Sequence, residues 1–76
     1  LAKHRGISFE QAASVFFDPF LRLVDASRNE EARDAVIGLD TDCRLLFVVH
    51  IELEGDAIRI ISARRATTRE RAIYDS

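Results

Sequence analysis

The sequence has one cysteine, one proline and no tryptophan or methionine, and it contains no long hydrophobic run. With the single thiol of Cys43, the chain makes no internal disulfide and no cysteine-based zinc site. No apolar segment approaches the roughly 20 residues of a membrane-spanning helix. Residues 1–5 lack the apolar core of a secretory signal, so we expect a cytoplasmic protein with a reduced cysteine and no contact with membranes.

The chain has 76 residues, which suffices for one domain near the lower size limit for a self-sufficient core. Hydrophobic residues make up 47% and charged residues 32%, a balance that indicates a folded globular protein rather than a disordered one. Because the sequence does not begin with methionine, we expect it to be part of a longer protein.

Charge is unevenly distributed along the chain. Eleven basic and 13 acidic residues give a net charge of −2, which disfavours coating of nucleic acid by bulk electrostatics. Acidic residues crowd the middle of the chain, whereas five arginines lie between positions 59 and 71. Guanidinium groups bind phosphates and carboxylates bidentately, so this segment is either an anion site or a solvated basic face.

Two capping boxes predict helices. Ser8 followed by Gln11 begins a helix that Asp18-Pro19 should end, and residues 3–6 resemble the C-terminus of a preceding helix. The apolar stripe of the Ser8 helix consists of Phe9, Ala12, Ala13, Phe16 and Phe17. Thr67 followed by Glu70 begins a closing helix that extends to about Tyr74.

Four strand-like runs lie between these helices, at residues 20–25, 33–39, 45–51 and 57–65. The third run is continuously hydrophobic, which predicts a central strand, and the short connections predict an antiparallel meander. We therefore expect an α+β fold in which N-terminal helices pack on a four-stranded antiparallel sheet, with a short C-terminal helix.

The last hairpin groups three chemically useful side chains if its turn has two residues, Glu54-Gly55. His50 then lies opposite Arg59, with Glu52 one diagonal step away, a set suited to acid–base work on a phosphodiester. A three-residue loop would break the grouping. The alternatives are a core histidine for His50 and an ion pair with Arg59 for Glu52.

Further along the last strand, Arg64 should project from the face opposite Arg59 if the strand is regular. Arg64, Arg65 and the helix start at Thr67 are candidates for a phosphate seat, and Arg69 for either a phosphate ligand or an exposed helix charge. No glycine-rich phosphate loop, serine nucleophile elbow or helical pair of metal-binding carboxylates occurs, so we expect no cofactor or metal.

The sequence resembles the BrnT toxins of type II toxin–antitoxin systems. The resemblance covers nearly the whole chain and is carried by Lys3-His4, residues 6–10, Ala12-Ala13, Val15-Phe16, Asp18-Pro19, residues 48–50 with Glu52, residues 58–64, and residues 69–71 with Tyr74. The run Ile-Arg-Ile-Ile-Ser-Ala-Arg at 58–64 is the most specific of these segments. The strand that usually opens the family is missing from this sequence.

The resemblance implies a RelE-like ribonuclease fold and metal-independent RNA cleavage, in a ribosomal context, that inhibits translation. It also implies a BrnA-type antitoxin with a ribbon-helix-helix domain. The toxin would contact DNA only indirectly, through this antitoxin. For such a reaction we assign transition-state stabilisation to Arg59 and Arg64, and proton transfer to His50 or Glu52. Phosphate positioning is assigned to Lys3, His4, Arg65, Thr67 and Arg69.

Two other functions fit the same residues. The arginines of a non-catalytic binding module, or of an inactive toxin homologue, would face an acidic segment of a protein partner. A small structural subunit of an unrelated complex is the third possibility.

Overall fold

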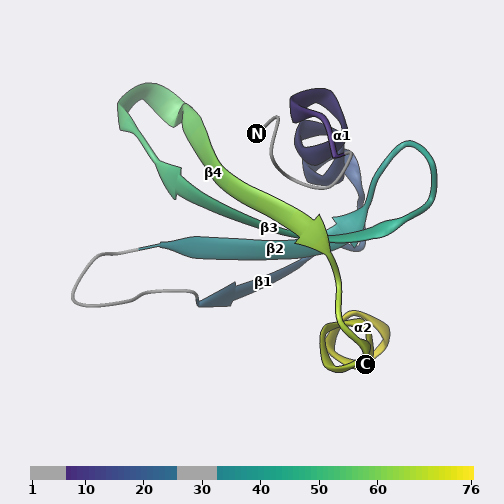
Figure 1. Ribbon diagram of the computed structural model, residues 1–76. Coiled ribbons are helices and arrows are strands. Elements are labelled where there is room, and N and C mark those ends of the chain that lie inside the picture. Colours follow the sequence, from purple (N-terminus) through teal and green to yellow (C-terminus); the bar gives the residue numbers. More distant parts are fainter. Residues whose placement is uncertain (1–6, 26–32) are drawn as a thin grey trace.

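The protein folds into a four-stranded antiparallel sheet with one helix on each side (Figure 1). The computed structural model describes residues 7–25 and 33–76. The elements in chain order are α1 (Phe9–Ser14), the 3₁₀ helix η1 (Val15–Phe17), β1 (Arg22–Asp25), β2 (Asp34–Leu39), β3 (Leu45–Glu52), the 3₁₀ helix η2 (Glu54–Asp56), β4 (Ile58–Arg65) and α2 (Thr68–Asp75). The expected helix end at residues 3–6 lies outside the described residues.

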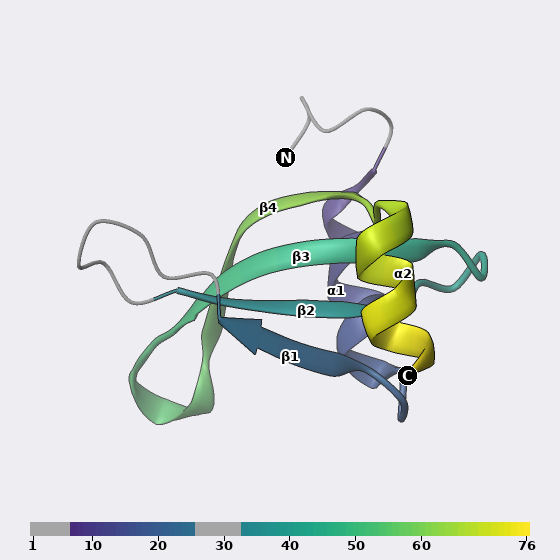
Figure 2. The same cartoon turned by 90° about the horizontal axis from the view of Figure 1, so that it is seen from below.

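The strands lie in the order β1-β2-β3-β4, so every strand pairs with its neighbour in the sequence. All three pairs are antiparallel, which confirms the predicted meander and the inner position of β3. Figure 2 shows α1 and α2 on opposite sides of this sheet. The α+β class is therefore confirmed, and α2 begins as predicted with a capping box between Thr67 and Glu70.

The first helix begins at the predicted capping box, but its buried stripe differs from the expected one. Ala12 and Val15 are fully buried, whereas Phe9 is 55% and Phe17 is 85% exposed. The chain tightens into 3₁₀ geometry at Val15, and three residues per turn rotate Phe17 away from an α-helical stripe. Phe9 is the first residue of α1, before this change, and the 3₁₀ turn does not account for its exposure. The prediction that both phenylalanines cover the sheet is therefore wrong.

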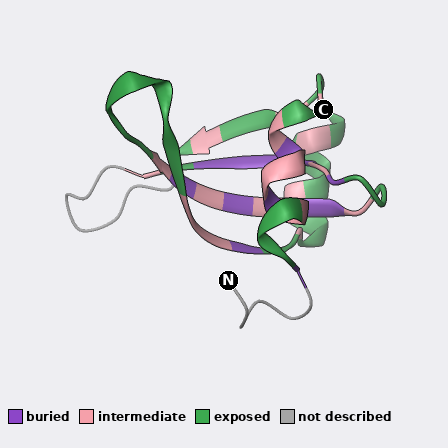
Figure 3. Ribbon diagram, turned by 90° about the horizontal axis from the view of Figure 1, so that it is seen from above, coloured by how far each residue is buried: buried purple, intermediate pink, exposed green. Residues whose placement is uncertain are grey.

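Each face of the sheet has its own set of side chains, because directly paired residues share a face. We call the side under α1 the α1 face; its core contains Val36, Leu46, Val48 and Ala63. The other side, the α2 face, carries Ile37, Phe47 and Arg64. Figure 3 shows that β2 is largely buried, while β1 and the turn end of the β3–β4 hairpin, residues 52–59, are largely exposed.

One carboxylate connects three elements at the end of the sheet. The Oδ2 atom of Asp18 accepts hydrogen bonds from the Leu39 amide of β2 at 2.9 Å and from the Tyr74 hydroxyl of α2 at 2.7 Å. Its Oδ1 atom accepts from the Phe20 amide at 2.9 Å. Desolvation alone would raise the pKa of Asp18, but these hydrogen bonds outweigh it and lower the pKa below its ordinary value.

The Asp18–Tyr74 hydrogen bond predicts two pH limits for the stability of the fold. The bond to Asp18 raises the pKa of Tyr74 to about 12, so its stabilisation is complete below the unfolded value of about 10 and is lost as pH rises to about 12. The lowered pKa of Asp18 gives the opposite sign: its stabilisation is present above about pH 4 and is lost as pH falls through the folded pKa.

We therefore expect Tyr74→Phe to lower the free energy of unfolding by about 2 kcal/mol at pH 7, the typical net contribution of a hydrogen bond to a charged group. Urea titrations followed by circular dichroism between pH 9 and pH 12 measure the effect. Tyr74 is the only tyrosine in the chain, so the variant should also lack the alkaline loss. An unchanged alkaline profile in Tyr74→Phe would contradict the role of this bond.

Candidate active site

The β3–β4 turn has three residues rather than two. Glu54–Asp56 form η2, with Gly55 and Asp56 at positive φ angles of 75° and 64°, and the Leu53 amide donates to the Ala57 carbonyl at 2.8 Å. The register that follows differs from the predicted one by one residue.

This shift separates the catalytic set expected from the sequence. His50 pairs with Ile60, and Arg59 pairs with Ile51. Arg59 therefore projects from the α2 face, whereas His50 and Glu52 project from the α1 face. The predicted grouping of the three side chains is wrong, because a one-residue change of register turns a side chain to the other face.

A β-bulge in β4 changes a second prediction. Val49 pairs with Ser62 while His50 pairs with Ile60, so Ile61 is an extra residue without a partner in the ladder. Arg64 then pairs with Phe47 on the α2 face. The prediction that Arg59 and Arg64 project from opposite faces assumed a regular strand; the bulge places both on the α2 face.

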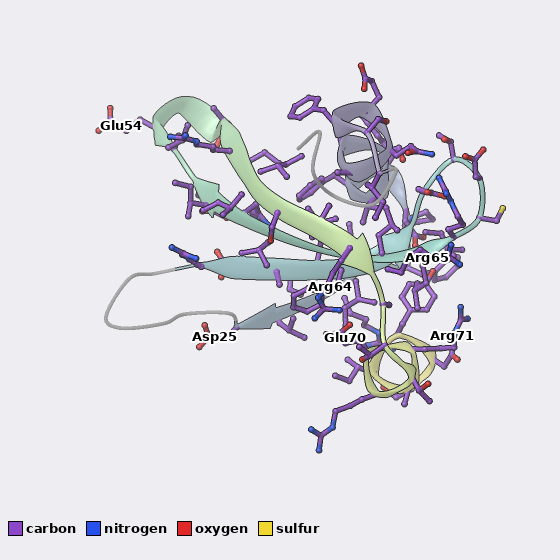
Figure 4. All side chains as sticks on the ribbon, viewed as in Figure 1. Asp25, Glu54, Arg64, Arg65, Glu70 and Arg71 are labelled. Atoms are coloured by element: carbon purple, nitrogen blue, oxygen red, sulfur yellow. The ribbon has the colours of Figure 1, made fainter. Side chains whose placement is uncertain are left out.

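Arg64 is held by three contacts where β4 gives way to α2 (Figure 4). Its Nη1 and Nη2 atoms donate to the two carboxylate oxygens of Glu70, each at 2.7 Å. Nη1 also donates to the Arg65 carbonyl at 3.2 Å. The guanidinium carbon lies 4.4 Å from the centre of the Phe47 ring, a cation–π geometry.

The pKa values of Arg64 and Glu70 both shift in the direction that favours the charged form. The hydrogen bond to Glu70 is the main cause that raises the pKa of Arg64, and the bond from Arg64 is the main cause that lowers the pKa of Glu70. The side chain of Arg64 is 49% exposed, so solvent and ligands still reach the guanidinium.

The other basic residues of this segment do not converge on Arg64. Arg65 pairs with Leu46 and so lies on the α1 face, and Arg69 is an exposed residue of α2. The Thr67 hydroxyl accepts the Glu70 amide in the capping box. Arg64 and the Thr67 amide both donate to Oε1 of Glu70, so this carboxylate occupies the position expected for a phosphate, and Arg65 lies on the other face. Lys3 and His4 lie outside the described residues.

His50 lies in the core of the α1 face. It is 3% exposed, and its ring meets the Phe16 ring edge-on at 5.1 Å and 84°. Its Nδ1 atom has no hydrogen-bond partner among the described residues. Glu52 is exposed at the hairpin end of the same face. The sheet therefore lies between these two groups and Arg64.

Three hollows lie on the described surface, and none of the three is lined by an arginine of β4. One is lined by residues 19–22 and 74–76, one by Glu52 and residues 53 and 56–58, and one by residues between Ser14 and Cys43. In the part of the chain that the structure describes, no three histidine, cysteine or acidic side chains form a group that could hold a metal ion.

Comparison with known families decides the identity of the chain. A family model described as the ribonuclease toxin BrnT of type II toxin–antitoxin systems matches residues 1–70. The chain belongs to the BrnT family. No curated protein matches the chain. Within the described residues, no helix has the length and apolar character needed to cross a membrane.

For a BrnT-family ribonuclease toxin, the arrangement on the α2 face includes two residues that sequence reasoning missed as functional. Glu70 was expected only as a capping residue, and Phe47 only as part of an apolar strand. Their relation to Arg64 depends on the bulge and on the direction in which α2 leaves the sheet. The acidic residue six positions after Arg64 was the only sequence signal.

The positions of His50 and Glu52 lead to a test of proton transfer. We expect His50→Leu to fold stably, because it replaces an imidazole with an unpartnered nitrogen by an apolar side chain of similar size. Both His50→Leu and Glu52→Gln should retain growth arrest and RNA cleavage within about threefold. Circular dichroism gives the folded state of each variant. A folded variant that has lost cleavage would return that residue to the mechanism.

Proposed function

We propose that this BrnT-family protein is a metal-independent endoribonuclease whose cleavage of RNA inhibits translation, and that its active surface is the α2 face of β3 and β4. The observation that supports this most directly is the fixed guanidinium of Arg64. It lies half-exposed over Phe47, on the same face as Arg59. A cation held in place before the reaction stabilises developing negative charge without reorganisation.

The chemistry requires little beyond such cations. The ribose 2′-oxygen attacks the adjacent phosphorus, and the bond to the 5′-oxygen breaks, which leaves a 2′,3′-cyclic phosphate and a 5′-hydroxyl. The proton lost by the 2′-hydroxyl balances the one gained by the leaving oxygen. Extra negative charge collects on the phosphoryl oxygens in between, and Arg64 is the group that we assign to it.

Arg59 has a different task in this proposal. Arg59 and Arg64 are five positions apart in the sequence, and at roughly 3.3 Å per residue of strand, with one residue taken up by the bulge, their Cα atoms are about 15 Å apart. The two side chains therefore contact different parts of one RNA strand. Arg59 binds a neighbouring phosphate and sets the direction of the strand across the face, while Arg64 acts at the cleaved linkage.

The partner that we propose is an antitoxin of the BrnA type, with a ribbon-helix-helix domain that alone contacts DNA. The exposed arginines of β4 and α2 offer charge complementarity to an acidic segment of that protein. An antitoxin that covers the α2 face blocks RNA from Arg64, so inhibition needs no change in the fold.

Arg64→Ala tests the catalytic assignment. Loss of one fixed donor typically costs about 10²–10³ in rate, so the variant should cleave RNA more slowly by that factor and no longer arrest growth. Arg64→Lys should recover little, because an ammonium does not reproduce the planar fork. Cleavage of a labelled RNA, with and without a chelator, measures both the rates and the metal requirement.

Arg71→Ala is the matched control, since it removes an exposed arginine of α2 that lies outside the Arg64–Glu70 ion pair. It should cleave at the wild-type rate. Full activity of Arg64→Ala would remove Arg64 from the mechanism, and loss of wild-type cleavage in the chelator would contradict metal independence.

Expression of the gene distinguishes a toxin from a binding module. We expect the wild-type protein to arrest growth when expressed alone and to be tolerated together with a neighbouring ribbon-helix-helix gene. Ribosome-associated RNA should be cleaved only in the first case. A protein that is harmless by itself, yet still forms a complex with an acidic partner, would favour the non-catalytic alternative.

A further inference from the structure

We propose that Glu70 is a positioning residue of this site: its carboxylate holds one edge of the Arg64 guanidinium and leaves the other edge free to bind an RNA phosphate. This inference rests on the proposed function, because it concerns the same reaction. It assigns to α2 a part in the chemistry that the capping box alone would not give it.

The hydrogen-bond donors of Arg64 divide into two groups. Nη1 donates to Glu70 and to the Arg65 carbonyl, and one hydrogen of Nη2 donates to Glu70. A guanidinium has five N–H groups, so Nε–H and the second hydrogen of Nη2 remain. Neither has an acceptor among the described residues. These two hydrogens lie on one edge of the fork and match two oxygens of a phosphate.

The two side chains of the ion pair differ in exposure in the way that this role requires. The Glu70 side chain is only 14% exposed, whereas that of Arg64 is 49% exposed. The carboxylate of Glu70, which orients the guanidinium, is thus largely shielded from solvent, whereas the guanidinium of Arg64 is accessible to a ligand. The guanidinium carbon also lies over the Phe47 ring, so the carboxylate and the ring hold the guanidinium from two directions. A phosphate reaches Arg64 without displacing Glu70.

Glu70 does not fit the role of general base. Its Oε1 atom accepts from Arg64 and from the Thr67 amide at 2.8 Å, and Oε2 accepts from Arg64. These bonds, with that from Arg64 first, lower the pKa of the carboxyl, so it is a weak proton acceptor at neutral pH. Orientation of Arg64 is the role that its contacts support.

Glu70→Gln tests the proposal, because it keeps the size of the side chain but turns one acceptor into a donor that faces an Arg64 N–H. A misplacement of about 1 Å typically costs about 10²-fold in rate, so kcat should fall by about that factor while KM changes little. Spectra of ¹⁵N-arginine-labelled protein add a second measurement. Addition of a 2′-O-methyl RNA, which cannot be cleaved, should shift the Arg64 Nε–H signal in the wild type but not in Glu70→Gln.

Tyr74→Phe is the control for general loosening of α2. It removes the Asp18 contact at the other end of the helix and leaves the Arg64–Glu70 pair in place. At temperatures where circular dichroism shows it folded, it should keep wild-type kcat and the Nε–H shift. Loss of cleavage in both variants would assign the effect to docking of the helix and overturn the specific role of Glu70.

The remaining outcomes separate this inference from the proposed function. If Arg64→Ala is inactive but Glu70→Gln cleaves at the wild-type rate or faster, the positioning role is wrong and the ribonuclease stands. If the wild type cleaves no RNA, the ribonuclease proposal fails. The shift of the Arg64 Nε–H signal on addition of RNA then tests whether Glu70 orients Arg64. A Nε–H signal that RNA does not shift in the wild type, or shifts equally in Glu70→Gln, overturns the inference.

Discussion

The extra residue in β4, Ile61, determines which arginines share a face of the sheet. A regular strand would turn Arg64 toward the α1 face, away from Phe47 and from the side on which α2 lies. Because of the bulge, one residue of β4 is not paired with β3. In return the bulge gives Arg64 an aromatic platform, a carboxylate partner and a common face with Arg59. The candidate site therefore depends on an irregularity of the backbone more than on any single side chain.

The same site depends on how α2 is attached to the sheet. No residue of α2 is buried, and an isolated helix of eight residues is only marginally stable in water. Polar contacts hold it instead: Glu70 in its first half binds Arg64, and Tyr74 near its end binds Asp18. Arg22 of β1 also donates to the carbonyl of Ser76, the C-cap of the helix. Arg64 is thus an attachment point of the helix as well as the group to which we assign RNA binding. The rigidity of the site comes from directed hydrogen bonds rather than from apolar burial.

Local signals in the sequence predicted the helices and strands well, but they did not predict the pairing register of β3 and β4. The capping boxes at Ser8 and Thr67 and the apolar runs of β2 to β4 involve residues a few positions apart, so the sequence displays them directly. The turn at Glu54–Asp56 is different, because Gly55 fits a two-residue or a three-residue loop equally well, and only the positive φ of Asp56 selects the latter. The bulge at Ile61 leaves no sequence pattern, since isoleucine is common in regular strands. The conditional grouping of His50, Glu52 and Arg59 failed at this step, whereas the emphasis on Arg64 did not depend on it.

The acidic net charge of the chain is compatible with an enzyme that acts on RNA, for a reason that the Arg64–Glu70 pair illustrates. Ten of the eleven basic residues are arginines, yet the carboxylate beside Arg64 offsets much of its charge at a distance. Ground-state binding of a polyanion is then weak, because few phosphates are neutralised. In the reaction that we propose, the free N–H edge of Arg64 has a fixed direction, and the negative charge that it stabilises grows only as the phosphorus becomes pentacoordinate. Only interactions that strengthen in the transition state raise the rate of the chemical step, so an arginine paired in this way contributes to catalysis without binding RNA tightly.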